Sequence, residues 1–256
     1  MGSVPSKAEG TRLLHLLEVM HRLRGPGGCP WDAEQTHRSL GRHLLEETHE
    51  TLEAIDTGDP SRLREELGDL LLQVVFHAEI AAAEGTFDID DVAEGITAKL
   101  VRRHPHVFGD VSVESAAEVL VNWERNKTEE KGEHAVDDQI PSTLPALARA
   151  SKVQRRAAGS GFDWRTREAA MEKVREELAE LDSAPPERTE EELGDVLFAL
   201  AALGRRLNVD PETALRGATR RFAERFERMR TAVRSEGVAL ESLSDEELMR
   251  RFRSAR

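Results

Sequence analysis

Apolar residues recur three and four positions apart along most of the chain, which is the spacing of an apolar stripe on an α-helix. Leu13, Leu17 and Met20 follow this spacing near the N-terminus. The same spacing returns over 67–75 and over 193–200. Alternating patterns typical of strands are hard to find. The pattern therefore predicts an all-α protein.

Glycine and proline interrupt these stripes and predict where helices end. The interruptions fall at 25–28, 57–60, 85, 104–105, 159–161 and 185–186. A polar stretch without apolar periodicity covers 126–138. Such a composition favours a linker over a packed helix.

The most informative feature is an internal repeat. In the first half LEETHETLEAI is followed by REELGDLL, and in the second half REELAEL is followed by EEELGDVLFAL. Glu47 corresponds to Glu177 at an offset of 130 residues, and small differences in loop length change the offset elsewhere. Two copies of one helical unit are predicted, at 10–125 and 140–256, with a linker at 126–139.

The charge balance narrows the class of ligand. The chain has 36 Lys and Arg against 49 Asp and Glu, a net charge of −13. A nonspecific nucleic-acid binder needs a positive surface, so we expect no nucleic-acid partner. A small polyanion remains compatible with this charge if divalent metal lies between carboxylate and phosphate.

Cysteine usage and hydropathy indicate the compartment. The single cysteine, Cys29, cannot form an internal disulfide, which favours a reducing cytoplasm. No apolar run reaches the roughly 18 residues of a membrane span, and MGSVPSKAEG lacks the core of a signal peptide. We expect a cytoplasmic protein with no membrane partner.

Acidic residues three positions apart occur in pairs within the repeated segments, and such residues share one face of a helix. The pairs are Glu47 with Glu50, Glu66 with Asp69, Glu177 with Glu180, and Glu192 with Asp195. Four carboxylates from two antiparallel helices make an oxygen-only site that suits Mg²⁺, with Mn²⁺ as a substitute. A metal bound there can also lower the pKa of a water molecule for attack on phosphorus.

A solvated helix face is the alternative explanation for any single EExxE motif. Recurrence of EExxE followed by ExxD in both halves favours the metal site. Gly68 and Gly194 lie inside the ExxD motifs, where glycine costs roughly 1 kcal/mol relative to alanine. Close approach of another group to the backbone and a tight helix crossing are equally good explanations.

Basic residues also recur in register with the acidic motifs, and a polyphosphate beside metal needs such cations. Four positions before the motif glutamates stand His43, Lys173, Arg62 and Arg188. Lys99 and Arg103 in the first half match Arg221 and Arg225 in the second. Taken singly, each is better explained as an ordinary surface charge; as a repeated set they favour a site.

Other metal and phosphate sites fit less well. A di-iron bundle needs Glu-x-x-His twice, and only 46–49 supplies it. Zinc prefers Cys and His ligands, and one cysteine with nine scattered histidines offers no such cluster. The glycines at 25–28 lack the following lysine of a nucleotide-binding P-loop.

The motifs together resemble the MazG nucleoside triphosphate pyrophosphohydrolases over nearly the whole chain. They are GCPWDxxQT, EExxE with EELGD in the first half and the matching acidic motifs in the second, RRHPHVFG, NWERNK and GFDW. The resemblance implies hydrolysis of NTPs and dNTPs to monophosphate and pyrophosphate. It also implies Mg²⁺ and an all-α homodimer of tandem MazG-like repeats.

By motif, the resemblance carries over these metal ligands: Glu47, Glu50, Glu66, Asp69, Glu177, Glu180, Glu192 and Asp195. Glu46 and Glu176 are expected to hold a further metal or orient the attacking water. Nucleotide contacts are expected from Lys173, Arg188, Arg221 and Arg225. We expect the second repeat to be the catalytic one because it has Lys173 where the first has His43. Activity in the first repeat as well, or a role of the first repeat in building the dimer, are the alternatives.

Two positions depart from the family pattern. Arg188 and Arg221 stand where relatives often have lysine, which keeps the charge and changes the geometry. Met249 stands near the C-terminus, where relatives can have an aromatic residue that could stack on a base.

The mechanism we expect is attack of water on the α-phosphorus; attack at the β-phosphorus gives the same products. A hydrolase dedicated to damaged or non-canonical nucleotides is a narrower form of this hypothesis. The alternatives are a sensor of nucleotides without turnover and a binding protein for a toxin or stress factor.

Overall fold

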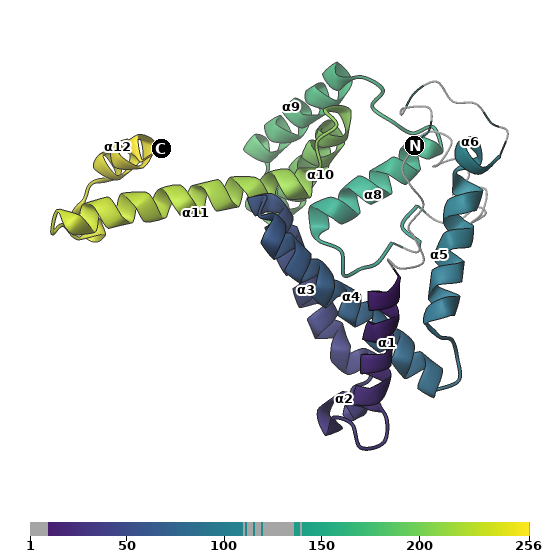
Figure 1. Ribbon diagram of the computed structural model, residues 1–256. Helices are drawn as coiled ribbons and strands as arrows, with labels where there is room; N and C mark the ends of the chain where they lie inside the picture. The colour runs from purple at the N-terminus through teal and green to yellow at the C-terminus, as the bar shows by residue number, and fades with distance from the viewer. Residues whose placement is uncertain are drawn as a thin grey trace. The chain divides into compact units, whose positions relative to one another are not determined.

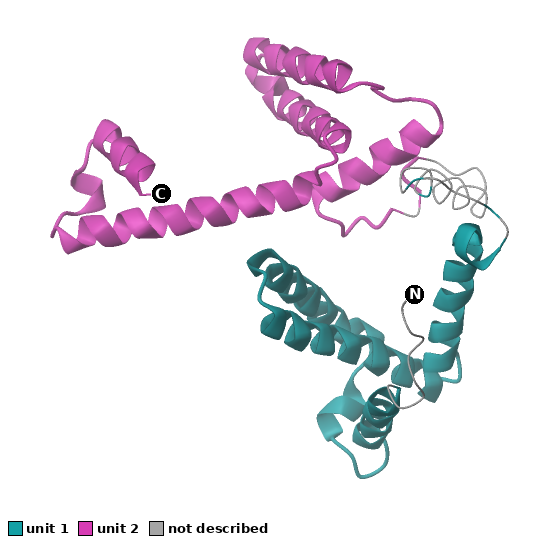
Figure 2. Cartoon of the chain, turned by 45° about the horizontal axis from the view of Figure 1, so that its top comes forward, with its two compact units in different colours: residues 1–123 teal, residues 124–256 magenta. Residues whose placement is uncertain are grey.

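The computed structural model describes residues 10–109, 111, 115, 119, 136–138 and 140–255, and in these residues helix is the only regular structure (Figure 1). This confirms the predicted all-α class. The chain divides into two compact units, residues 1–123 and 124–256 (Figure 2). Most of the predicted linker lies outside the described residues, so the boundaries at 125 and 140 stay predictions.

The helices of the first unit are α1 (Thr11–Arg24), α2 (Pro30–Glu34), α3 (His37–Thr57), α4 (Pro60–Ala83), α5 (Ile89–Arg103) and α6 (Pro105–Phe108). A capping box starts α3, in which Thr36 and Ser39 each bond the backbone N–H of the other. The short loop between α3 and α4 turns at Gly58, whose φ of 71° suits glycine. The two helices therefore pack as an antiparallel hairpin.

The core of the first unit lies where α1 and the start of α3 pack against the C-terminal half of α4. Its buried members are Met20, Leu40, Val75, Phe76 and Ile80. The N-terminal half of α4, which carries the acidic motif, lies beyond this core along the hairpin.

The helices of the second unit are α8 (Ala146–Gly159), α9 (Arg167–Ser183), α10 (Thr189–Arg206), α11 (Pro211–Ser235) and α12 (Asp245–Ser254), with 3₁₀ turns at Pro186–Arg188 and Leu240–Ser242. Helices α9 and α10 form the matching hairpin, and α8 packs on α10. Thr166 caps α9 as Thr36 caps α3. The core is smaller, consisting of Ala170, Val174, Ala199 and Leu203 with Trp164 and Met171 packed against it.

One expectation about these helices is partly wrong. An apolar stripe on a helix is expected to pack in a core, and this expectation covers the stripe after each acidic motif. Leu67, Leu71 and Val74 are nevertheless exposed in the first unit. Leu193, Leu197 and Leu200 are exposed at the matching positions of the second. These helices are apolar on more than one side, and the neighbours within each unit cover only one of them.

The positions of helix breaks agree with the glycine and proline signals. Within the described part of the chain, no helix combines the length and the hydropathy that a membrane span requires.

Candidate metal and nucleotide site

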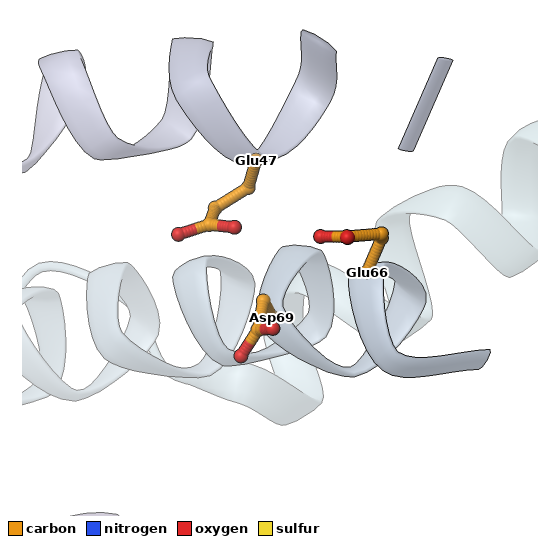
Figure 3. A group of neighbouring side chains, drawn as sticks. All are labelled: Glu47, Glu66 and Asp69. Atoms are coloured by element: carbon orange, nitrogen blue, oxygen red, sulfur yellow. The ribbon is translucent and has the colours of Figure 1, made fainter. Parts of the chain in front are cut away.

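Three carboxylates meet across the first hairpin. Glu47 comes from α3, and Glu66 with Asp69 comes from the facing turn of α4 (Figure 3). One oxygen from each residue lies within 4.8 Å of the others. Glu66 is 8% exposed, so part of this negative charge is withheld from water.

The second hairpin repeats this arrangement. Glu177 comes from α9, and Glu192 with Asp195 comes from α10, again with oxygens within 4.8 Å of one another. Glu177 and Glu192 are buried, at 7% and 3% exposure, and Asp195 is exposed. The structure thus brings together six of the eight residues predicted as metal ligands.

Glu50 and Glu180 do not belong to the acidic clusters that the described residues form within that distance. Both lie exposed on the helix that carries the clustered glutamate, one turn further on. Glu50 is still close enough to Glu47 to act on its pKa. A ligand role for Glu50 and Glu180 stays a prediction.

The first cluster holds more negative charge than its cations neutralise. Burial is the largest cause of a raised pKa at Glu47, and the charges of Asp69, Glu50, Glu46 and Glu66 raise it further. Such a group of carboxylates is stabilised when a divalent cation lies between them. All its donors are carboxylate oxygens, which suits Mg²⁺ or Mn²⁺ better than zinc. The residues present therefore fit the predicted metal.

The cations four residues before the buried glutamates form ion pairs with them. Arg62 lies 3.4 Å from Glu66 and 2.6 Å from Glu53. In the second unit Arg188 lies 2.6 Å from Glu192. The hydrogen bond with Glu53 is the largest cause of the raised pKa of Arg62.

The two units differ at the next predicted cation. Lys173 contacts both Glu176 and Glu177, at 2.8 Å and 2.7 Å, and hydrogen bonding to Glu176 is the largest cause of its raised pKa. His43 lies 3.7 Å from Glu46 instead. Among the described residues, the second cluster thus has two cations paired with its carboxylates where the first has one.

Arg221 and Arg225 line a surface cleft of about 380 Å³ between α11 and α12, together with Phe222 and Phe252. Arg225 donates hydrogen bonds to the carbonyl oxygens of Phe252, at 2.5 Å, and Arg253, at 2.6 Å. Its guanidinium group lies 4.5 Å from the centre of the Phe252 ring. Arg225 therefore fastens α12 to α11.

Phe252 is an aromatic residue near the C-terminus that was not among the predicted site residues. It lies one turn after Met249 and packs against Phe222 with ring centroids 5.1 Å apart. The signal that could have found it is the pairing of Phe222 and Phe226 on one face of α11 with an aromatic residue on the last helix.

Lys99 and Arg103 lie one turn apart on α5, as predicted from their spacing. Their approach to the first cluster stays a prediction. At Gly68 and Gly194 an added Cβ would meet none of the described residues within 4 Å. A tight crossing with another described helix of the same unit is therefore the wrong explanation for these glycines, and close approach of another group remains.

Comparison with known proteins shows the family. Residues 35–108, which contain the first hairpin, match the MazG nucleotide pyrophosphohydrolase domain. The chain is also 47% identical over 245 residues to the nucleoside triphosphate pyrophosphohydrolase/pyrophosphatase MazG of Thermotoga maritima, a match that covers 94% of each chain.

The chain belongs to the MazG family. It is 47% identical over 238 residues to the nucleoside triphosphate pyrophosphohydrolase of Escherichia coli K12, covering 88% of this chain and 89% of the relative. A Mycobacterium tuberculosis protein of the same name is 47% identical over 162 residues, covering 62% of this chain and 49% of the relative. Both tandem units of this MazG chain carry the acidic cluster.

Proposed function

We propose that this MazG chain hydrolyses nucleoside triphosphates, both NTPs and dNTPs, to the monophosphate and pyrophosphate in a Mg²⁺-dependent reaction. The observation that carries the proposal is the repeated cluster of two glutamates and one aspartate across a helical hairpin. Membership of the MazG family supports the reaction class.

Glu47, Glu66 and Asp69 in the first unit, and Glu177, Glu192 and Asp195 in the second, would hold the metal. Bound Mg²⁺ supplies positive charge for the phosphates and lowers the pKa of a coordinated water. The carboxylates of Glu46 and Glu176 lie exposed beside these clusters, where they can orient the attacking water and accept its proton.

In the second unit the basic side chains act on the phosphates. Lys173 and Arg188 sit at the edge of the cluster, where they can leave their carboxylate partners for phosphate oxygens once the metal neutralises the glutamates. The α-phosphorus gains a bond to the water oxygen and loses its bond to the bridging oxygen. Pyrophosphate then leaves with the displaced electron pair.

The cleft between α11 and α12 supplies a place for the rest of the nucleotide. Arg221 adds a cation, and the rings of Phe222 and Phe252 offer surfaces on which a base can stack. Because stacking discriminates poorly among bases, this cleft fits an enzyme that accepts several nucleotides, non-canonical ones included.

A homodimer and a cytoplasmic location belong to the same proposal. The exposed apolar residues beside each cluster support the dimer, because a soluble chain rarely leaves such stripes uncovered on several helices. Size-exclusion chromatography with light scattering tests the dimer, and a single-chain mass would contradict it.

Product analysis of the purified chain with a panel of NTPs and dNTPs, including deaminated and oxidised bases, tests the reaction. Monophosphate and pyrophosphate are expected with Mg²⁺ and not with a chelator. Hydrolysis in ¹⁸O-labelled water places the label in the monophosphate for attack at the α-phosphorus. No turnover of any nucleotide, or release of orthophosphate, would overturn the proposal.

A further inference from the structure

Trp31 is a large aromatic residue that the fold holds rigidly and leaves 52% exposed. Gln35 donates a hydrogen bond of 2.9 Å to its carbonyl oxygen, and Arg24 donates one of 2.5 Å to the carbonyl oxygen of Asp32. Gly28 lies three residues before Trp31 and packs closely on α1. A Cβ added at Gly28 would lie 2.3 Å from a backbone oxygen of that helix, so the loop packs directly on it. The ring is therefore presented to solvent from a fixed support.

This ring contacts the helix that carries Glu47, through His43. Its centroid is 6.2 Å from that of His43, with the two planes at 71°. His43 is one helical turn before Glu47 on α3, about 6 Å along the axis. An edge-to-face contact covers at most one broad face of either ring.

The second unit uses the matching tryptophan differently. Gly161 and Trp164 repeat the spacing of Gly28 and Trp31, but Trp164 is half-buried and packs against the core. Trp164 stands two residues before the capping threonine, and Trp31 stands five residues before its own, with α2 between them. The three extra residues keep Trp31 out of the core.

The residue beneath the ring changes together with the tryptophan. The unit with the exposed Trp31 has an imidazole, His43, against it. The unit with the half-buried Trp164 has Lys173 at that position, paired with glutamates. His43 thus contacts the ring of Trp31, whereas Lys173 pairs with Glu176 and Glu177.

We infer that Trp31 is a stacking platform for the base of a nucleoside triphosphate whose phosphates are bound at Glu47, Glu66 and Asp69. This rests on the proposed function and assigns the first unit a base-binding surface of its own. An exposed indole on a hydrogen-bonded segment that contacts the helix of Glu47 suits a nucleobase, because every base has a π-face. The backbone of this segment needs little further ordering when a base binds.

The test uses the full chain with Glu177→Gln, which removes a ligand from the second cluster. Binding of a non-hydrolysable NTP analogue and of inorganic tripolyphosphate is measured by calorimetry in Mg²⁺. Trp31→Ala is expected to weaken binding of the NTP analogue about 5- to 150-fold, the range for loss of one stacked base. Tripolyphosphate has no base, so its affinity should not change.

Trp31→Phe keeps an aromatic face and should restore most of the affinity. Phe87→Ala, a change at another exposed aromatic residue of the first unit, should have no effect. Tryptophan fluorescence should be quenched by the NTP analogue in the Glu177→Gln chain and much less so when Trp31→Phe is added.

Equal affinity of the Trp31→Ala and parent chains for the NTP analogue would overturn the platform and leave the metal site standing. Failure of both ligands to bind the first cluster would overturn the platform together with the first unit's role. Hydrolysis by the unsubstituted chain, assayed in parallel, shows separately whether the proposed function holds.

Discussion

The ammonium group of Lys173 lies 2.7 Å from a carboxylate oxygen of Glu177, one turn further along α9. At the matching place in the first unit, His43 contacts Glu46 at 3.7 Å and leaves Glu47 among other carboxylates. A lysine and a metal ion would compete for Glu177, whereas within the described part of the chain Glu47 has no lysine paired with it. The two clusters therefore differ in how they respond to metal and pH.

Replacing one clustered glutamate in each unit separates their contributions. Glu177→Gln is expected to lower NTP hydrolysis about 100-fold or more, because loss of a ligand should exceed the 10- to 100-fold effect of residues behind the ligands. Glu47→Gln is the matched control in the first unit and should have the smaller effect. Full turnover in the Glu177→Gln chain would show that the second unit is not the catalytic one.

Lys173→Met removes the cation that occupies Glu177. Without metal, this substitution should lower the free energy of unfolding by about 1 to 2 kcal/mol. That range lies between the contributions of exposed and of buried ion pairs. Mg²⁺ should then bind the second cluster more tightly, while kcat/KM for nucleotides falls. Chemical unfolding with and without Mg²⁺, together with metal titration, measures both effects.

The raised pKa of Lys173 predicts how the destabilisation by Lys173→Met depends on pH, which provides a control for this experiment. Because folding raises that pKa, the ion pair contributes its full stability below the ordinary lysine value of 10.5 and loses it only as the pH rises further. The destabilisation by Lys173→Met should thus be constant across neutral pH. A change between mildly acidic and neutral pH would point to another group.

Glu47 gives a different pH dependence. Folding raises its pKa, so the folded state binds the proton more tightly than the unfolded one. The metal-free chain should lose stability as the pH rises from the ordinary value of 4.5 through the raised value. Glu47→Gln should flatten this part of the curve in thermal unfolding with chelator. An unchanged dependence of stability on pH would mean that burial and the neighbouring carboxylates do not raise the pKa of Glu47.

Arg225→Lys tests whether this arginine holds α12 or contacts nucleotide. Lysine keeps the charge but cannot donate to the carbonyl oxygens of both Phe252 and Arg253 in the same geometry. We expect faster proteolysis at the C-terminus, with about 1 to 3 kcal/mol lost from the docking of α12. An increase in KM without any change in proteolysis would assign Arg225 to the nucleotide instead.

Gly194→Ala should raise the free energy of unfolding by about 0.5 to 1 kcal/mol, because alanine favours helix and an added Cβ meets open space. If substrate approaches this backbone, the same substitution should raise KM. Gly68→Ala is the matched change in the first unit. A loss of stability in the isolated chain would show that something already packs on these glycines.

The sequence by itself determined the all-α class, the internal repeat and the residues of the two acidic clusters. Helical spacing is local, so residues three and four apart share a face in any α-helix, and a short loop forces two successive helices to pack antiparallel. Those two facts bring Glu47 opposite Glu66 and Asp69 without knowledge of the rest of the fold.

Only the tertiary structure decided which apolar faces are covered, and which cations are already engaged. Leu67 and Val75 belong to the same predicted stripe, yet one is exposed and the other lies in the core. Trp31 and Trp164 carry the same motif signal, and three extra residues leave one exposed and the other packed. Burial depends on contacts between segments distant in sequence, and spacing along one helix does not contain that information.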